Sequence, residues 1–406
     1  MDKPLQGFRI LDFTQFFSGP ICTLLLADYG AEVIKIENPP VGDFTRYGNV
    51  VENQASSLFT TRNRGKKSIV LNMKEEKQKE LFLKLVKSAD AVVENFKPGT
   101  MKKFGITYEL LKEINPRIVY TSISGYGQEG PYADHAAYDQ TVQAEAGIVS
   151  ITGQKDGEPV KCGAAIGDYC GGLIGCIGTL MGIVQAQKTG VGRRIDVSMM
   201  DSLIFGLENQ LSAYLKTGRI PVPTGNSYFS AAPIGSYICK DGKKLMISIG
   251  TDREWVRFAN AMEQPQWLEN PAYQTMRKRA DLREEIDHEV QVVFLKYTQQ
   301  EIIERMHAAH CVYGRINNFE EVSAHPQVQF RKTLVNAVYP DGTTFKVPGN
   351  PMLMNDLERE TEYKMAPLGA DTMEVLKEVS DEETLHKIFD PVLKEVEEAI
   401  QLMYKN

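Results

Sequence analysis

The chain has 406 residues, of which 42% are hydrophobic and 24% are charged, and its formal net charge is −7. This length exceeds one ordinary hydrophobic core and predicts two domains, while the composition is that of a soluble globular protein. The negative charge argues against a nucleic-acid partner.

Apolar runs in the first half alternate between strand and helix patterns. Residues 8–13 and 31–37 are predicted strands, and residues 21–29 between them are a predicted helix that follows a turn at 14–20. A β-α-β unit of about 30 residues is typical of a parallel sheet covered by helices. The alternation continues with strands at 66–74, 91–96, 118–123 and 195–198 and helices at 75–88, 108–114, 139–146 and 201–215. We therefore predict an α/β fold with an open, doubly wound, Rossmann-like parallel sheet over residues 1–220.

A Pro- and Gly-containing stretch at 221–226 reads as a linker. After it, residues 236–249 predict a hairpin with Asp241-Gly242 at its turn. Further helices are predicted at 252–262, 278–297 and 299–307, and residues 340–347 predict a β segment before a helical tail from 371. The segment 221–330 is thus a predicted smaller α+β domain.

One long apolar run, residues 163–182, contains Asp168 and many glycines. It predicts a helix that starts at about Asp168, with Gly167, Gly171, Gly175, Gly178 and Gly182 clearing one face for close approach of another backbone. An aspartate at this point is typical of a helix N-cap. Because glycines interrupt the run and it falls short of the ~20 residues of a membrane span, we interpret it as core and expect no membrane partner.

The six cysteines, at 22, 162, 170, 176, 239 and 311, show no CxxC or metal-ligand spacing. They indicate a reducing interior, and the first residues show no signal-peptide pattern, so a cytoplasmic location is predicted.

The sequence lacks the motifs of several common kinds of catalytic and binding site. GxSxG, P-loop and metal-ligand patterns are absent, and the first turn, at 14–20, lacks GxGxxG, which argues against a dinucleotide cofactor there; the histidines are scattered, and Asp139 with Asp168 form only a loose carboxylate pair. Lysines near predicted strand ends form either a site for a polyphosphate ligand or a solvated charged face: Lys66, Lys67, Lys74, Lys97, Lys102 and Lys103.

Several segments, taken in order, resemble the class III (family III) CoA-transferases, which include formyl-CoA:oxalate and carnitine CoA-transferases. They are residues 3–14, Gly30 to Glu37, Gly42-Asp43 with Arg46, Val93-Glu-Asn-Phe-Lys-Pro-Gly99, Tyr120 to Gly127, Tyr138-Asp139 and Gly163-Ala-Ala-Ile-Gly-Asp168. Each piece is weak by itself, but together they cover nearly the whole chain.

The resemblance implies an acyl-CoA:carboxylate CoA-transferase in which Asp168 attacks an acyl-CoA thioester. Mixed-anhydride and aspartyl-CoA intermediates follow, with coenzyme A as co-substrate and no metal. It also implies that residues 331–406 return to the large domain, and that two chains form an interlocked homodimer. We also expect backbone N–H groups near Gly167 to stabilise the developing oxyanion.

Residue by residue, the resemblance implies CoA contacts at Ser18, Leu71, Asn72, Met73, Lys74, Asn95, Phe96, Lys97, Lys103 and Tyr138. The chain departs from the oxalate enzymes at Asn38, Ala136, Gln15 and Phe17, and residues 225–232 replace a glycine-rich loop. The first two departures put CoA contacts in doubt, and the others argue against oxalate. A substrate pocket is predicted from Gln15, Phe16, Phe17, Tyr228 and Phe229, the four aromatic rings giving it a more apolar acyl side.

Two alternatives stay open from the sequence. One is a racemase of α-methylacyl-CoA esters, which needs an acid/base pair beside the α-carbon; His135 is the one histidine between the first turn and Asp168. The other is an acyl-CoA-binding protein without catalysis.

Overall fold

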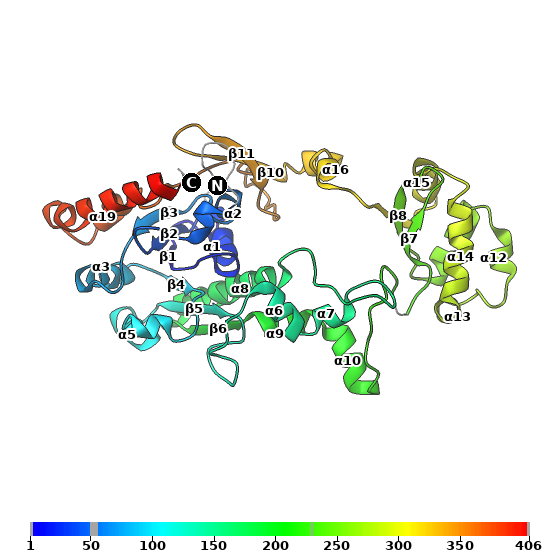
Figure 1. The fold of residues 1–406 in the computed structure, drawn as a ribbon, viewed down its shortest axis with the longest axis horizontal. Coiled ribbons are helices and arrows are strands. Elements are labelled where there is room, and N and C mark those ends of the chain that lie inside the picture. Colours follow the sequence, from blue (N-terminus) through cyan, green and yellow to red (C-terminus); the bar gives the residue numbers. More distant parts are fainter. Residues whose placement is uncertain (1–2, 49–55, 229, 404–406) are drawn as a thin grey trace. The chain divides into compact units, whose positions relative to one another are not determined.

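The computed structural model describes residues 3–48, 56–228 and 230–403, and the chain divides into two compact units (Figure 1). The larger unit contains Met1–Ile148, Cys162–Thr217 and Pro326–Asn406, and the smaller contains Val149–Lys161 and Gly218–His325. Residues 149–161, which lie within the predicted first part of the large domain, thus group with the smaller unit.

A six-stranded sheet forms the centre of the larger unit. Its order is β3-β2-β1-β4-β5-β6, and every neighbouring pair is parallel. The strands are β1 (Arg9–Asp12), β2 (Glu32–Glu37), β3 (Lys67–Val70), β4 (Ala91–Glu94), β5 (Val119–Ser124) and β6 (Arg194–Ser198). Because β1 lies between β2 and β4, the chain reverses direction across the sheet at β1, and ligands of such sheets bind beyond the carboxyl ends at this point.

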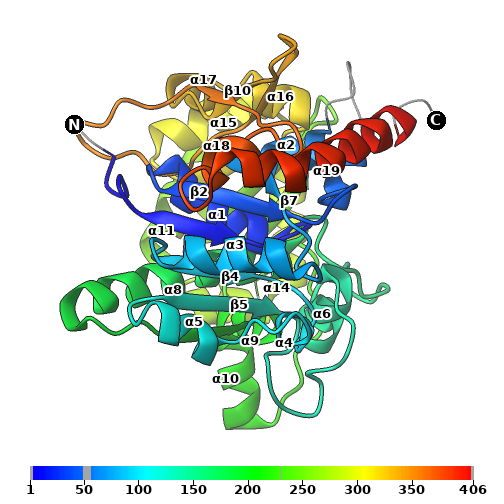
Figure 2. The same cartoon turned by 90° about the vertical axis from the view of Figure 1, so that its left-hand side faces the viewer.

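Helices cover both faces of this sheet. On one face α3 (Glu76–Val86), α5 (Tyr108–Ile114), α18 (Thr372–Leu376) and α19 (Glu382–Met403) enclose a core that includes Leu11, Ile36 and Val92 (Figure 2). On the other, α1 (Ser18–Asp28), α6 (Asp139–Glu145), α8 (Ile166–Thr189) and α9 (Met199–Gly206) pack on Ile10, Val93 and Ile123. The central strands are buried on both sides, which explains their continuous apolar runs.

Shorter elements complete the larger unit. Strands β10 (Leu334–Val338), β11 (Thr344–Pro348) and β12 (Glu362–Lys364) form a second sheet, against which Phe59 of α2 (Ser57–Asn63) packs. The remaining elements are η1 (Phe44–Tyr47), α4 (Thr100–Lys103), α7 (Ile148–Ile151, at the boundary of the units), α10 (Glu208–Thr217) and α17 (Pro326–Phe330).

The smaller unit is α+β. Strands β7 (Ile234–Ile238), β8 (Lys244–Ser248) and β9 (Val312–Arg315) form an antiparallel sheet, and the predicted turn at Asp241-Gly242 is confirmed, with Gly242 at φ 76°. Its core contains Trp255, Trp267 and Phe294. The helices are α11 (Asp252–Ala261), α12 (Pro265–Glu269), α13 (Met276–Asp281), α14 (Arg283–Phe294), α15 (Gln299–Ala308) and α16 (Phe319–Ser323).

Two predicted helices are each divided in the structure. The segment 201–215 is split between α9 and α10 at Leu207, and 278–297 is split between α13 and α14 at Leu282, whose φ of −102° and ψ of 27° lie outside the helical range. The apolar periodicity continues through both breaks, so the sequence pattern hides them. Strand β9 was not predicted.

The length argument against a membrane span is wrong. Helix α8 has 24 residues, and by length and composition it is the one described helix that could cross a membrane. In this structure Gly171, Cys176, Thr179 and Ile183 of α8 are buried, and Cys176 and Ile183 belong to the core on the sheet.

Candidate active site

A buried ion pair lies beneath the turn that follows β1. Lys66 Nζ is 3.0 Å from Asp12 Oδ2 and also donates to Thr23 Oγ1 (2.7 Å) and Asn63 Oδ1 (2.9 Å). Burial by itself would raise the pKa of Asp12, but the charges of Lys66 and Lys35 outweigh it and hold that pKa below its usual value. Lys66 is therefore a structural cation, and its predicted membership of an anion site is wrong.

An amide joins the turn after β1 to the end of β4. Asn95 Oδ1 accepts from the Gln15 N–H (2.7 Å), and Asn95 Nδ2 donates to the Gln15 carbonyl (2.8 Å) and to Ser18 Oγ (3.3 Å). Phe16, within the same turn, has φ 63°, a left-handed conformation that is unusual for a bulky residue. The structure thus brings three predicted site residues together, at the sheet edge where ligands are expected.

Asp168 does not cap its own helix. Helix α8 begins at Ile166, so Asp168 occupies its third position, and the cap is supplied by another residue: Asp139 Oδ1 accepts from the N–H of Gly167 (2.8 Å) and of Asp168 (3.4 Å). Gln143 Nε2 in turn donates to Asp139 Oδ2 (2.7 Å). The N-cap interpretation of Asp168 is wrong, and the Gly167 N–H assigned to the oxyanion is already bound by Asp139.

The carboxyl of Asp168 faces the first turn of α1. Burial raises its pKa to about 6, and the charge of Asp139 adds to the rise, while Arg62 and hydrogen bonds from the backbone and side chain of Ser18 lower it. Two helix N-termini, those of α1 and α8, thus stand beside one partly buried carboxylate. Such an environment, with a perturbed carboxyl group at a sheet's ligand-binding edge, is typical of a functional site.

Close approach of α8 to α1 depends on Gly172. A Cβ atom added there would lie 2.5 Å from the Ser18 carbonyl oxygen and 2.9 Å from Ile21 Cβ. By contrast, the predicted series at Gly171, Gly175 and Gly182 meets side chains of Met199, Ile123 and Val119 rather than backbone. The expectation of a glycine-dependent backbone contact is therefore correct in kind, but it applies to a different glycine.

We expect Gly172→Ala to destabilise the protein by about 1–3 kcal/mol, because the added methyl group would force α8 and α1 apart. The matched control is Gly206→Ala: Gly206 is exposed in α9, and nothing lies within 4 Å of its added Cβ. Thermal unfolding should show a lower melting temperature for the first variant and an equal or slightly higher one for the second. Equal melting temperatures would contradict the packing role of Gly172.

Arg62, in the last turn of α2, was not identified from the sequence. Its guanidinium lies 3.5 Å from the centre of the Phe17 ring and its charge acts on Asp168. In the sequence, Arg62 is visible only as the first residue of the basic run 62–67. Its distance along the chain from Asp168 gives no indication that the two residues lie close together.

The predicted CoA contacts follow the carboxyl ends of β3 and β4. The side chains of Leu71 and Met73 are buried in the core, so only their backbone is open to a ligand. Asn72 Oδ1 accepts from the Lys74 N–H (3.0 Å), which fixes the turn.

The other predicted CoA contacts differ in how exposed they are. Phe96 is half-buried, and Lys74, Lys97, Lys103 and Tyr138 are exposed. Of the two departures, Asn38 is exposed and donates to the Pro39 carbonyl, and Ala136 is exposed.

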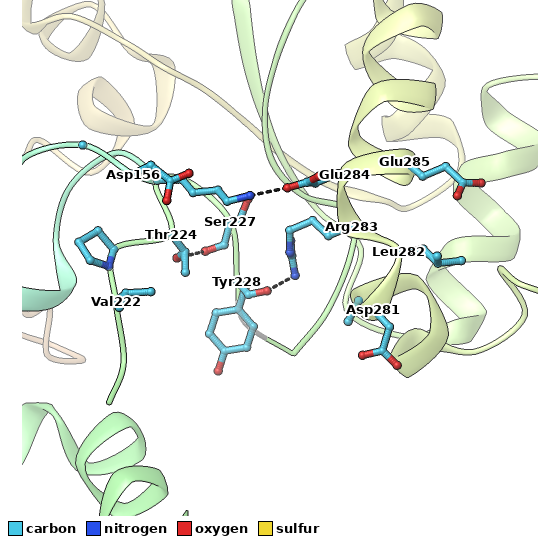
Figure 3. Close-up of a pocket in the computed structure, with 14 residues that line it drawn as sticks. Asp156, Val222, Thr224, Ser227, Tyr228, Asp281, Leu282, Arg283, Glu284 and Glu285 are labelled. Atoms are coloured by element: carbon cyan, nitrogen blue, oxygen red, sulfur yellow. Dashed lines mark hydrogen bonds and ion pairs between the residues drawn. The ribbon is translucent and has the colours of Figure 1, made fainter. Parts of the chain in front are cut away.

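Tyr228 belongs to the smaller unit, and Phe229 lies outside the described residues. Tyr228 is 41% exposed and lines a cavity of about 860 Å³ within that unit (Figure 3). Arg283 holds its loop by donating to the carbonyls of Tyr228 and Ala231, while Lys155 and Glu284 form an ion pair across the cavity. The larger unit supplies Gln15, Phe16 and Phe17 of the predicted substrate pocket.

Within the described ranges, no group of three or more His, Cys, Asp or Glu side chains is placed to hold a metal ion. All six cysteines are free thiols, and burial raises the pKa of Cys176 to about 12.

Comparison with known proteins agrees with this fold. The model of CoA-transferase family III matches residues 5–372. A succinate–glutarate CoA-transferase of Agrobacterium fabrum is 34% identical over 96% of this chain and 98% of its own length, and an acetyl-CoA:oxalate CoA-transferase of Acetobacter aceti is 34% identical over 90% and 92%. The crystal structure of a CAIB/BAIF family protein from Brucella suis superposes with a TM-score of 0.82 at 30% identity, covering 94% of this chain and 100% of the other.

The family match and these relatives define the class of protein, an enzyme that transfers CoA between acyl groups. The chain belongs to CoA-transferase family III. Its activity is the transfer of CoA from an acyl-CoA to a carboxylic acid, which the family match and the relatives support.

Proposed function

We propose that Asp168 carries the acyl group during this transfer. A carboxylate oxygen of Asp168 attacks the thioester carbonyl, the C–S bond breaks, and a mixed anhydride and CoA thiolate form. The thiolate then attacks the aspartyl carbonyl, which releases the first acid and leaves aspartyl-CoA. The acceptor carboxylate attacks this thioester to give a second anhydride, and the thiolate takes the new acyl group and frees Asp168.

The observation that carries this proposal is the position of the carboxyl group. Asp168 is half-buried, Ser18 lowers the pKa of its carboxyl, and its N–H is bound by Asp139, at the edge of the sheet where α1 and α8 both begin. Enclosure limits access of water, which would otherwise hydrolyse the anhydride. The N–H of Ser18, in the first turn of α1, is placed to stabilise negative charge beside Asp168.

CoA itself would bind along the same edge. We propose contacts from Ser18, Leu71 to Lys74, Asn95, Phe96, Lys97, Lys103 and Tyr138, with the exposed lysines on the phosphates. Gln15, Phe16 and Phe17 of the larger unit would line the acyl side of this site. The larger unit, Met1–Ile148, Cys162–Thr217 and Pro326–Asn406, would form the Rossmann-like CoA-binding domain, and Val149–Lys161 with Gly218–His325 the small domain.

We also propose an interlocked homodimer in the cytoplasm, without a membrane or nucleic-acid partner. Its support is a set of exposed apolar side chains on neighbouring helices: Ile177, Met181 and Val184 of α8, Phe205 of α9 and Leu215 of α10. Apolar surface of this kind marks protein contacts.

A screen tests the function directly. Purified protein is mixed with succinyl-CoA or acetyl-CoA and a panel of mono- and dicarboxylic acids, and new acyl-CoA species are detected by mass spectrometry. The relatives act on succinate with glutarate and on oxalate, so dicarboxylic acids head the panel. Formation of the acceptor's CoA ester supports the proposal. Deuterium uptake at the α-carbon without a second acid would favour a racemase, and binding without exchange would favour a binding protein.

We expect kcat/KM for the acyl-CoA to fall about tenfold per pH unit below about pH 6 and to be level above it. The ionised carboxyl is the nucleophile, and its raised pKa places its protonation in this range. Asp139→Asn should move the inflection to lower pH, because it removes a charge that raises the pKa of Asp168. An unchanged inflection in that variant would contradict the assignment of the titrating group.

A further inference from the structure

Four arginines are buried in the described part of the chain, and three of them have a carboxylate partner. Arg46 is 2.6 Å from Glu37, Arg64 is 2.7 Å from Asp28 and Arg279 is 2.9 Å from Asp252. Arg62, only 7% exposed, forms no ion pair within 4 Å with any residue that the structure describes. A buried cation without a counter-charge is costly, which makes Arg62 an exception that needs an explanation.

The hydrogen-bonding edge of Arg62 is only partly used. Its Nη1 donates to the Leu58 carbonyl (2.7 Å), and the Phe17 ring covers one face of the guanidinium. Its buried Nε has no hydrogen-bond partner among residues 3–48, 56–228 and 230–403. A guanidinium whose face is held by an aromatic ring and whose edge keeps unused donors is suited to bind a planar carboxylate through two hydrogen bonds.

Arg62 lies near the first turns of α8, because it stacks on Phe17, and the carbonyl of the next residue, Ser18, closely approaches Gly172 of that helix. Burial lowers the pKa of Arg62, and the charges of Tyr169, Asp168 and Asp43 act against that effect. Neither Asp168 nor Asp43 comes within ion-pair distance of it. The missing partner is therefore an anion that the folded chain does not supply from these neighbours.

We propose that Arg62 binds the distal carboxylate of a dicarboxylic substrate, whose other carboxyl group reacts at Asp168, so that this enzyme exchanges CoA between dicarboxylic acids. The inference rests on the proposed role of Asp168 as acyl carrier. A CoA phosphate is the other anion available, but the whole pantetheine arm separates the phosphates from the thioester, whereas Arg62 acts directly on Asp168.

The test compares two acceptors that differ in one charge. Glutarate and monomethyl glutarate are offered with succinyl-CoA to the wild type, Arg62→Gln and Arg62→Lys, at a pH well above the pKa of Asp168 so that its ionisation is not limiting. Arg117→Gln is the matched control, because Arg117 is exposed at the opposite edge of the sheet, before β5. Free CoA binding is measured for each variant by calorimetry.

We expect the wild type to prefer glutarate, and Arg62→Gln to lose about a hundredfold in kcat/KM for glutarate but less than about threefold for the monoester. Arg62→Lys keeps the charge without the planar fork and should fall between them, and CoA affinity should stay unchanged in all variants.

Three results would overturn the inference while leaving CoA transfer intact. They are equal losses for both acceptors, which would mean that Arg62 acts through Asp168 or the fold; a loss of CoA affinity, which would assign Arg62 to a phosphate; and a wild type without preference for the diacid. The last is read without any variant, so it decides the question even if Arg62→Gln does not fold. Absence of transfer to every acid would instead refute the proposed function.

Discussion

Replacement of Asp168 by Ala is expected to abolish CoA transfer, with a loss of at least about 10⁴-fold in kcat, because no other group takes the place of a covalent acyl carrier. Asp168→Asn keeps an acceptor for the hydrogen bonds from Ser18 but lacks the nucleophilic oxygen pair, and it should be equally inactive. Both variants should fold and bind free CoA, since the cap of α8 comes from Asp139. Initial rates followed by mass spectrometry measure the loss.

The matched control is Asp201→Asn. Asp201 is exposed and occupies the third position of α9, as Asp168 does in α8, so it tests the loss of a carboxylate at the same helical position. Hydroxylamine added during turnover should modify the wild type at Asp168 and leave the Asp168→Asn protein unlabelled. Substantial transfer by the Ala variant would contradict the mechanism.

The second large effect is on stability. Lys66→Met is expected to destabilise the larger unit by about 3–5 kcal/mol, because it leaves the fully buried Asp12 without its main counter-charge. Lys67→Met is the matched control: Lys67 is next in sequence, is one-third exposed and pairs with Glu32 and Glu374 at the surface, so its loss should cost less than about 1 kcal/mol.

Hydrogen exchange detected by mass spectrometry separates the two units in this test. Peptides from β1 and β3 report the larger unit, while both tryptophans, Trp255 and Trp267, lie in the core of the smaller one and report it by fluorescence. Faster exchange in β1 and β3 of Lys66→Met, but not of Lys67→Met, is the expected pattern. Equal protection in both variants would show that the Asp12–Lys66 pair does not hold this turn.

Local patterns were sufficient for much of the larger unit. Strands β1 to β4 each contain a short apolar run followed by a turn or helix signal, so the β-α alternation was visible without any contact information. The hairpin turn at Asp241-Gly242 was equally local. The motifs around Asp168 led to the family that the comparisons show.

The charges of the site could not be assigned in this way. Lys66 and Lys97 look alike in the sequence, yet one is sealed against Asp12 and the other is exposed, because burial depends on which distant elements pack over a side chain. The cap of α8 comes from Asp139, and the glycine that admits α1 is Gly172, since both depend on how helices cross rather than on spacing within one helix.

The sequence by itself determined the β-α alternation of the larger unit, the family and the candidate nucleophile, because these depend on short patterns of apolar, turn and motif residues. Only the tertiary structure decided that Ser18, Arg62 and Asp139 surround Asp168, because α1, α2 and α6 must first be folded around the sheet before their charges and dipoles act on one carboxyl group.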